Sequence, residues 1–135
     1  MSKINIKVQG QDITVIRLEE DDFISLTNLA GAFSESNNLI SKWISNKNTL
    51  EYLGLFETIH NMEFNYPEFD VIKNASGVNR FTMSVGQWLG RTSAKGFIVK
   101  AGKYGGTYAH KDIAFHFAMW LSPHFNFLLL GNINC

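Results

Sequence analysis

The sequence has a single cysteine, Cys135, so no disulfide can form within the chain. A chain with so few thiols fits a reducing compartment, and we expect a cytoplasmic protein. Long apolar runs are also missing, because none approaches the roughly 20 residues that a membrane-spanning helix needs. The lysines near the N-terminus are not followed by an apolar stretch, which argues against a signal peptide.

Acidic residues are absent from residues 71–111, a stretch of 41 residues with seven basic side chains. Residues 1–70 carry eleven acidic and five basic side chains, whereas residues 71–135 carry seven basic side chains and only Asp112. The halves therefore have net charges of −6 and +6 within a net charge of zero. This asymmetry indicates a polyanionic partner such as nucleic acid. The alternative is that the two halves neutralise each other in the fold.

The composition is that of one globular domain. The chain has 135 residues, of which 45% are hydrophobic and 18% charged, enough to bury a core. We therefore expect a single domain over residues 1–135.

The N-terminal region alternates apolar and polar residues with a period of two. Residues 4–8 and 13–18 are expected to form strands around a turn at residues 9–12, which makes a hairpin. Residues 19–22 are expected to be a solvated acidic loop, and residues 23–26 to lead into a helix.

The rest of the chain alternates helical spacing with short extended pieces. We expect helices over residues 27–33, 39–47, 49–56, 68–75 and 85–92, and one that begins at Asp112. The expected N-caps are Ser25 or Thr27, Thr49, and Ser84, and Pro67 is expected to start the fourth helix. The expected apolar faces contain Leu29, Ala30 and Phe33, then Ile40, Trp43 and Ile44, and in the last helix Phe115, Ala118 and Met119.

The first two expected helices are joined by a polar turn. Two short helices in this order have the outline of a helix-turn-helix, although most helical hairpins bind no DNA. With Trp43 facing inward, Lys42 and Asn46 face outward, and Asn48 lies beyond the end of the second helix.

A glycine-rich tip at residues 101–106 follows the apolar run 97–99 and returns through residues 107–109. The nucleotide-binding pattern G-x-x-x-x-G-K-[ST] is excluded, because five residues separate Gly96 from Gly102 and Tyr104 replaces the hydroxyl residue. Two interpretations remain, an ordinary hairpin with exposed lysines and a wing that approaches phosphate groups.

The histidines of the last helix do not form a recognisable metal site. His110, Asp112 and His116 lack the H-E-x-x-H spacing and a cysteine partner, so we expect Asp112 to be an N-cap and the histidine to lie on the surface. No cofactor is expected. A nuclease would need clustered carboxylates, which the basic half does not have, so we expect no enzyme.

Several motifs together resemble the KilA-N domain of bacteriophages, bacteria and large DNA viruses. They are DFISLTNLA at residues 22–30, Trp43 with NTLEYLGL at residues 48–55, EFD at residues 68–70, and KAGKYGGTYAHKDIAF at residues 100–115, followed by Trp120 and the Ser-Pro pair at residues 122–123. The Gly-Lys-Tyr-x-Gly-Thr pattern at residues 102–107 is also similar, more distantly, to the DNA-binding domain of fungal APSES transcription factors.

The resemblance implies a DNA-binding domain with an α+β fold, a helix-turn-helix at residues 23–48 and a wing at residues 97–109. It also implies a phage or prophage regulatory protein that acts in the nucleoid or in the host cytoplasm. We expect double-stranded DNA as the partner and no membrane. The residues expected to contact DNA are Lys42, Asn46, Lys47 and Asn48 in the major groove, Lys100, Lys103, Tyr104, Gly105 and Gly106 on the backbone, and, in second rank, Arg80, Arg91, Lys95 and Lys111.

A second hypothesis is a protein-interaction module, similar to an antirepressor that captures a partner protein. The acidic first half and the apolar C-terminal tail at residues 125–130 favour it. That tail is also a candidate surface for self-association.

Overall fold

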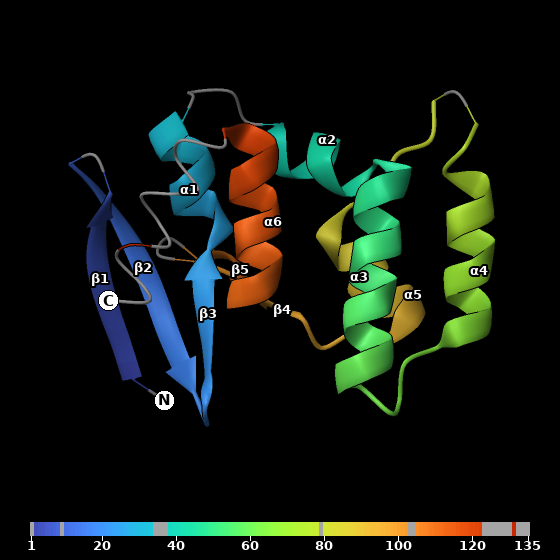
Figure 1. Cartoon of the computed structure of the whole chain (residues 1–135), viewed down its shortest axis with the longest axis horizontal. Helices are drawn as coiled ribbons and strands as arrows, with labels where there is room; N and C mark the ends of the chain where they lie inside the picture. Colours follow the sequence, from blue (N-terminus) through green and yellow to red (C-terminus); the bar gives the residue numbers. More distant parts are fainter. Residues whose placement is uncertain are drawn as a thin grey trace. The chain divides into compact units, whose positions relative to one another are not determined.

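The computed structural model describes residues 2–8, 10–33, 38–78, 80–102, 105–122 and 131. The chain divides into two compact units, one of residues 1–37 and 98–135 and the other of residues 38–97. The described residues form five strands and six helices (Figure 1), so the α+β expectation is confirmed. The two units are described in turn.

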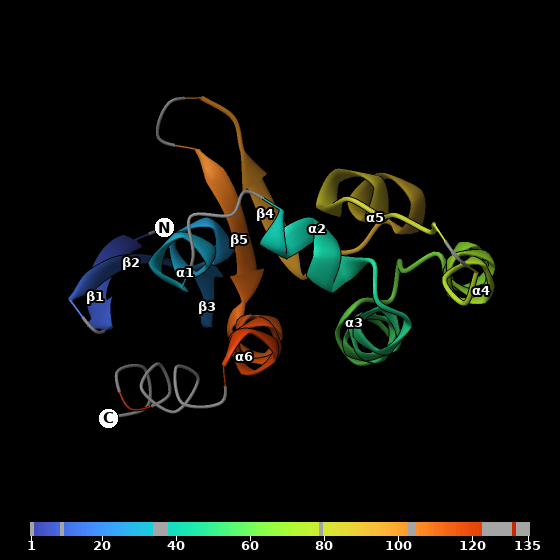
Figure 2. The same cartoon turned by 90° about the horizontal axis from the view of Figure 1, so that it is seen from above.

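The first unit is built on an antiparallel sheet with the strand order β1-β2-β3-β5-β4. Strands β1 (Ser2–Val8) and β2 (Gln11–Leu18) form the expected N-terminal hairpin, with Ile4 opposite Val15. Strands β4 (Phe97–Lys100) and β5 (Gly106–His110) flank the glycine-rich tip and lie side by side in Figure 2.

Strand β3 (Asp21–Ser25) corrects the sequence interpretation, which made residues 19–22 a loop and residues 23–26 the approach to a helix. The strand pairs with β2 and with β5, so it lies in the centre of the sheet. Phe23, Ile24 and Ser25 are all buried, because both faces of the sheet are covered here. A strand buried on both faces has no alternating pattern, which is why the period of two was missing.

Two helices cover the sheet of this unit. Helix α1 (Leu26–Phe33) contacts β2 and β5, helix α6 (Lys111–Leu121) contacts β3 and β5, and the two helices contact each other. Ser25 is the N-cap of α1, as expected, because its hydroxyl oxygen accepts a hydrogen bond from the Asn28 N–H at 3.0 Å. Phe33, expected beside Leu29 and Ala30, is half exposed.

Helix α6 buries a different face from the one expected. Ala118 is buried, but Phe115 is only partly buried and Met119 is exposed. The buried residues are Ile113, Ala114, Phe117 and Ala118. Nearly every position from 113 to 121 is apolar, so the helical pattern alone could not fix which face turns inward.

The second unit contains four helices: α2 (Leu39–Ile44), α3 (Lys47–His60), α4 (Tyr66–Ala75) and α5 (Val85–Thr92). Trp43 and Ile44 are buried as expected, and Ile40 is partly buried. Pro67 lies in the first turn of α4, and Ser84 caps α5 in a capping box with Gln87, which confirms both signals. Helix α3 begins earlier than expected, at Lys47 after the N-cap Asn46, and Thr49 is buried inside it.

Aromatic rings fill the space between α4, α5 and the loop that precedes α4. The rings of Phe64, Phe69 and Trp88 lie with centroids 5.6 to 6.0 Å apart. Gly54 of α3 faces the ring of Phe69, and an added Cβ atom there would overlap this ring. The absence of a side chain at Gly54 therefore sets how closely α3 and α4 approach.

A buried carboxylate fixes the path of the chain after α5. Glu57 is fully buried, and its Oε1 accepts hydrogen bonds from the Lys95 N–H at 2.8 Å and from Asn61 Nδ2 at 2.9 Å. Its Oε2 accepts one from the Gly96 N–H at 2.9 Å. Asn61 also donates to the carbonyl of Ser93 at 2.9 Å. These bonds attach residues 93–96, which lead into β4, to helix α3.

Replacing Gly54 with alanine should destabilise the protein by about 1 to 3 kcal/mol, because the ring of Phe69 is enclosed by other aromatic side chains and cannot move freely. Gly90→Ala is the matched control, since nothing lies within 4 Å of its added Cβ atom. This control should stabilise helix α5 by up to about 1 kcal/mol. Chemical unfolding monitored by circular dichroism measures both, and equal effects would contradict the packing role of Gly54.

The stability should also depend on the protonation of His116. Burial lowers the pKa of His116 below the ordinary value of 6.5. Below that value the unfolded chain binds the proton more readily, so the free energy of unfolding should fall as the pH decreases from 6.5 towards the folded pKa. Unfolding in urea at pH 7.5 and at pH 5 should show a smaller loss for His116→Gln than for the wild type. An equal loss would exclude His116 as the source.

Candidate nucleic-acid interface

The expected DNA-contacting residues fall into both units. Residues of the helical unit are Lys42, Asn46, Lys47, Asn48, Arg80, Arg91 and Lys95, and those of the sheet unit are Lys100, Gly105, Gly106 and Lys111. Lys103 and Tyr104 lie outside the described residues. The residues of each unit are therefore considered as a separate group.

The turn between α2 and α3 is tight and held by side chains. Asn46 has extended backbone angles, and its Nδ2 donates to the carbonyl oxygen of Lys42 at 2.9 Å at the end of α2. The hydroxyl oxygen of Ser45 accepts a hydrogen bond from the Met83 N–H at 2.9 Å. The Asn46 amide thus maintains the turn, which fixes how the first turn of α3 follows α2.

Basic side chains lie on both sides of this turn. Lys42 and Lys47 are exposed, as is Asn48 in the first turn of α3. Among the described residues, neither lysine forms an ion pair with a carboxylate. Their charges are thus available to an external anion. Lys47 lies at the N-terminal end of α3, where the macrodipole is also positive, whereas Lys42 lies in the last turn of α2.

Other basic residues of the helical unit are paired with acids. The Nε atom of Arg91 donates to Glu68 Oε1 at 2.7 Å, and the Nζ atom of Lys95 lies 3.5 Å from Glu63 Oε2. Lys73 lies over the ring of Phe69, with its Nζ 5.6 Å from the ring centroid. Arg80, by contrast, is exposed in the connection between α4 and α5 and has no ion pair with a described acid.

Glycine residues shape the tip of the hairpin β4–β5. Gly102 has φ of +102°, which favours glycine, and the Gly105 N–H donates to the Gly102 carbonyl at 3.0 Å. An added Cβ atom at Gly105 would overlap the backbone carbonyl of Lys100. The absence of a side chain at Gly105 therefore permits its close approach to the backbone of Lys100.

Helix α1 holds the second strand of this hairpin. The Thr107 N–H donates to the hydroxyl oxygen of Thr27 at 3.0 Å, and Gly106 leaves room for that hydroxyl group. Sequence analysis considered Thr27 only as an N-cap and missed this contact, which joins residues 80 positions apart. No local pattern could have predicted it.

The N-cap of α6 is His110 and not Asp112, which the sequence analysis expected. His110 is buried and is itself the N-cap of α6, because its Nδ1 accepts a hydrogen bond from the Asp112 N–H at 3.2 Å. The proton on Nε2 then points to Asp21 Oδ1, 3.2 Å away. The described residues contain no cluster of three or more potential metal ligands.

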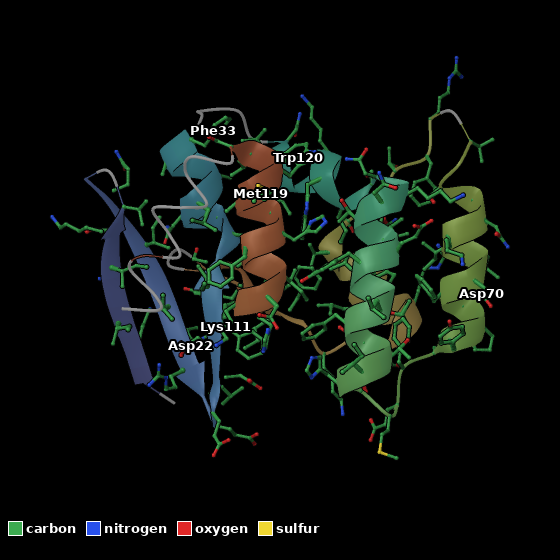
Figure 3. All side chains as sticks on the ribbon, viewed as in Figure 1. Asp22, Phe33, Asp70, Lys111, Met119 and Trp120 are labelled. Carbon is green, nitrogen blue, oxygen red and sulfur yellow. The ribbon has the colours of Figure 1, made fainter. Side chains whose placement is uncertain are left out.

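Asp22 of the sheet unit interacts with cationic side chains. The hydrogen bond from the guanidinium of Arg17 to Asp22, with Nε 2.7 Å from Oδ1, holds the pKa of Asp22 below its usual value. Lys111 contributes in the same direction and is seen near Asp22 in Figure 3. The charge of Lys111 is therefore partly compensated by that of Asp22.

The opposite charges of the two sequence halves do not become two oppositely charged units. Residues 38–97 contain six basic and five acidic side chains, whereas the other unit contains six basic and seven acidic ones. The pairs Arg91–Glu68 and Lys95–Glu63 each join one half of the sequence to the other. Any positive surface must come from the few unpaired cations.

Comparison with known proteins identifies the family of this chain. A family model described as the KilA-N domain matches residues 6–135, essentially the whole chain. The chain belongs to the KilA-N domain family. No curated protein and no solved structure matches it. KilA-N is a DNA-binding domain family rather than an enzyme family. In the part of the chain that the structure describes, no helix is long and apolar enough to cross a membrane.

Gly105→Ala should distort the hairpin of this KilA-N chain, because its Cβ atom would overlap backbone rather than a movable side chain. We expect a loss of about 1 to 3 kcal/mol and displaced amide signals in β4 and β5. Gly77→Ala, where nothing lies within 4 Å of the added Cβ atom, should change stability by no more than about 0.5 kcal/mol. Unperturbed hairpin signals in Gly105→Ala would disprove the tight turn.

Proposed function

We propose that this chain binds duplex DNA and that its two units act as a single domain. Family membership supports this, since KilA-N is a DNA-binding family. The observation that carries the proposal is the pair of exposed lysines, Lys42 and Lys47, on either side of the fixed turn between α2 and α3. Arg80 and Lys100 add cations that no described acid neutralises.

The first turn of α3 is the part that enters the major groove. Asn48 is exposed there and can offer both a donor and an acceptor to an adenine edge, while Lys42 and Lys47 contact phosphate groups or guanine. Asn46 acts indirectly, because its amide is used to cap α2. The helix-turn-helix of the proposal therefore centres on α2 and α3, at the end of the region 23–48 expected from the sequence.

The hairpin β4–β5 acts as a wing on the sugar-phosphate backbone. Lys100 supplies charge, and the absence of side chains at Gly105 and Gly106 lets the hairpin approach the DNA backbone closely. Lys103 and Tyr104 stay in the proposal because of their place in the sequence motif. A regulatory protein of a phage or prophage, acting in the cytoplasm, is the setting that the family resemblance favours.

Titration of duplex DNA at several salt concentrations tests the proposal. With about five phosphates neutralised, the logarithm of the binding constant should fall against that of salt with a slope near −4 to −5. Lys47→Gln should reduce the slope by about 1 and weaken binding to all sequences. Lys73→Gln is the matched control, since Lys73 is engaged with Phe69, and it should leave the slope unchanged.

A flat salt response or no binding at low salt would exclude DNA as the partner. Equal effects of Lys47→Gln and Lys73→Gln would instead place the interface elsewhere on the chain. Sequence preference should change with Asn48→Ala, which removes a group able to read a base edge but no charge.

Capture of a partner protein is the second candidate function. Phe33 at the end of α1 and Met119 and Trp120 on α6 are exposed toward the same end of two contacting helices (Figure 3). Large exposed apolar side chains in one place indicate a protein interface. Binding of a partner that survives nuclease treatment would favour this function.

A further inference from the structure

Arg80 has a backbone conformation that favours glycine. Its φ is +69°, and a hydrogen bond of 3.4 Å from the Phe81 N–H to the Val78 carbonyl closes the turn around it. The side chain is exposed and forms no ion pair with any acid that the structure describes. An exposed arginine therefore occupies a position where glycine would be less strained, and strain of this kind is typical of functional residues.

Ser45 attaches the connection that carries Arg80 to the turn between α2 and α3. The Ser45 hydroxyl accepts a hydrogen bond from the Met83 N–H at 2.9 Å and donates one to the Met83 carbonyl at 3.3 Å. The side chain of Met83 is buried, so this residue is held both by the core and by the turn. The connection between α4 and α5 therefore lies against the turn between α2 and α3.

Both segments lie at the same end of the helical unit. The connection between α4 and α5 runs past the end of α3 at which that helix begins (Figures 1 and 2). Lys42 and Lys47 are exposed on either side of the turn, and Arg80 precedes the anchored Met83 by three residues. Cations from two segments that are far apart in the sequence are thus brought to one end of this unit.

We propose that Arg80 binds a phosphate group of the DNA backbone and that Ser45 is the positioning residue that holds it beside α3. This inference rests on the proposed DNA-binding function. If the first turn of α3 enters the major groove, a segment beside that helix faces the sugar-phosphate backbone at the edge of the groove. The planar guanidinium of arginine can donate two hydrogen bonds to one phosphate group. Arg80 therefore adds affinity without adding sequence preference.

The left-handed conformation of Arg80 makes a sharp test possible. Arg80→Gly relieves the strain, so the urea midpoint of unfolding should stay unchanged or rise. The same variant should bind duplex DNA about tenfold more weakly, with a salt slope reduced by about 1. A purely structural role would instead lower stability and binding together.

Glu19→Gly is the matched control for this substitution. Glu19 also has a positive φ, +59°, and lies exposed in the turn between β2 and β3. Its replacement should leave the urea midpoint unchanged or raise it, and it should not weaken DNA binding, because it removes an acid and not a cation. An equal loss of DNA binding in Glu19→Gly and Arg80→Gly would overturn the inference.

The role of Ser45 is tested by combining variants. Ser45→Ala removes both hydrogen bonds to Met83 and should weaken DNA binding by about three- to tenfold, whereas Ser45→Thr keeps the hydroxyl and should bind like the wild type. In an Arg80→Gln background, Ser45→Ala should cost less than about twofold, because the cation that it positions is gone. An equal cost in both backgrounds would show that Ser45 does not act through Arg80.

Thr58→Ala is the control for loss of a hydroxyl group in the same unit. The Thr58 hydroxyl donates to the Gly54 carbonyl at 2.8 Å, in the part of α3 that is distant from the turn. This variant should bind DNA like the wild type. A loss as large as that of Ser45→Ala would overturn the role of Ser45.

The remaining outcomes separate this inference from the function on which it rests. Salt-dependent DNA binding that is equal in the wild type, Arg80→Gly and Arg80→Gln would overturn the inference and leave the function intact. No binding by the wild type at low salt would reject both. In a selection from random duplexes, Arg80→Gln should enrich the same sequences as the wild type, and a changed preference would overturn the assignment of Arg80 to phosphate.

Discussion

The buried carboxylate of Glu57 is the interaction on which the course of the chain depends. A charge without partners in a protein interior is costly, but here both oxygens accept hydrogen bonds from Lys95, Gly96 and Asn61. The backbone N–H groups that they satisfy belong to the segment that becomes β4. Phe97, the first residue of β4, then packs edge-on against Trp43, with ring centroids 6.2 Å apart. One side chain of α3 thus holds the segment that precedes β4.

Ion pairs between residues that are far apart in the sequence are the second general feature of this structure. The sequence separates acids and bases into halves, but the fold brings some of them into contact, as in Arg91–Glu68 and Lys95–Glu63. Such exposed pairs contribute little stability, and they remove cations from the set available to DNA. In the proposed DNA interface, the available cations are therefore a few unpaired side chains at turns, above all Lys42 and Lys47. Affinity with few phosphate contacts is modest.

Positions where local signals agreed were predicted well from the sequence. The alternating N-terminal hairpin, Pro67 at the start of α4 and the Ser84 cap of α5 all depend on residues close in sequence. The motif around residues 100–115 was sufficient to identify the family. The role of Lys42, Lys47 and the hairpin in DNA binding stays a prediction.

The sequence by itself determined most of the helices, because caps, turns and apolar periods are local properties. Its motifs determined the family, and with it the α+β class. Only the tertiary structure decided that residues 21–25 form the central strand, that α6 buries Phe117 rather than Met119, and that His110 caps α6. The tertiary structure also decided which lysine and arginine side chains form ion pairs with acidic residues. These features depend on partners as far away as Thr27 and Thr107, and residues so distant in sequence leave no local pattern that could reveal their contact.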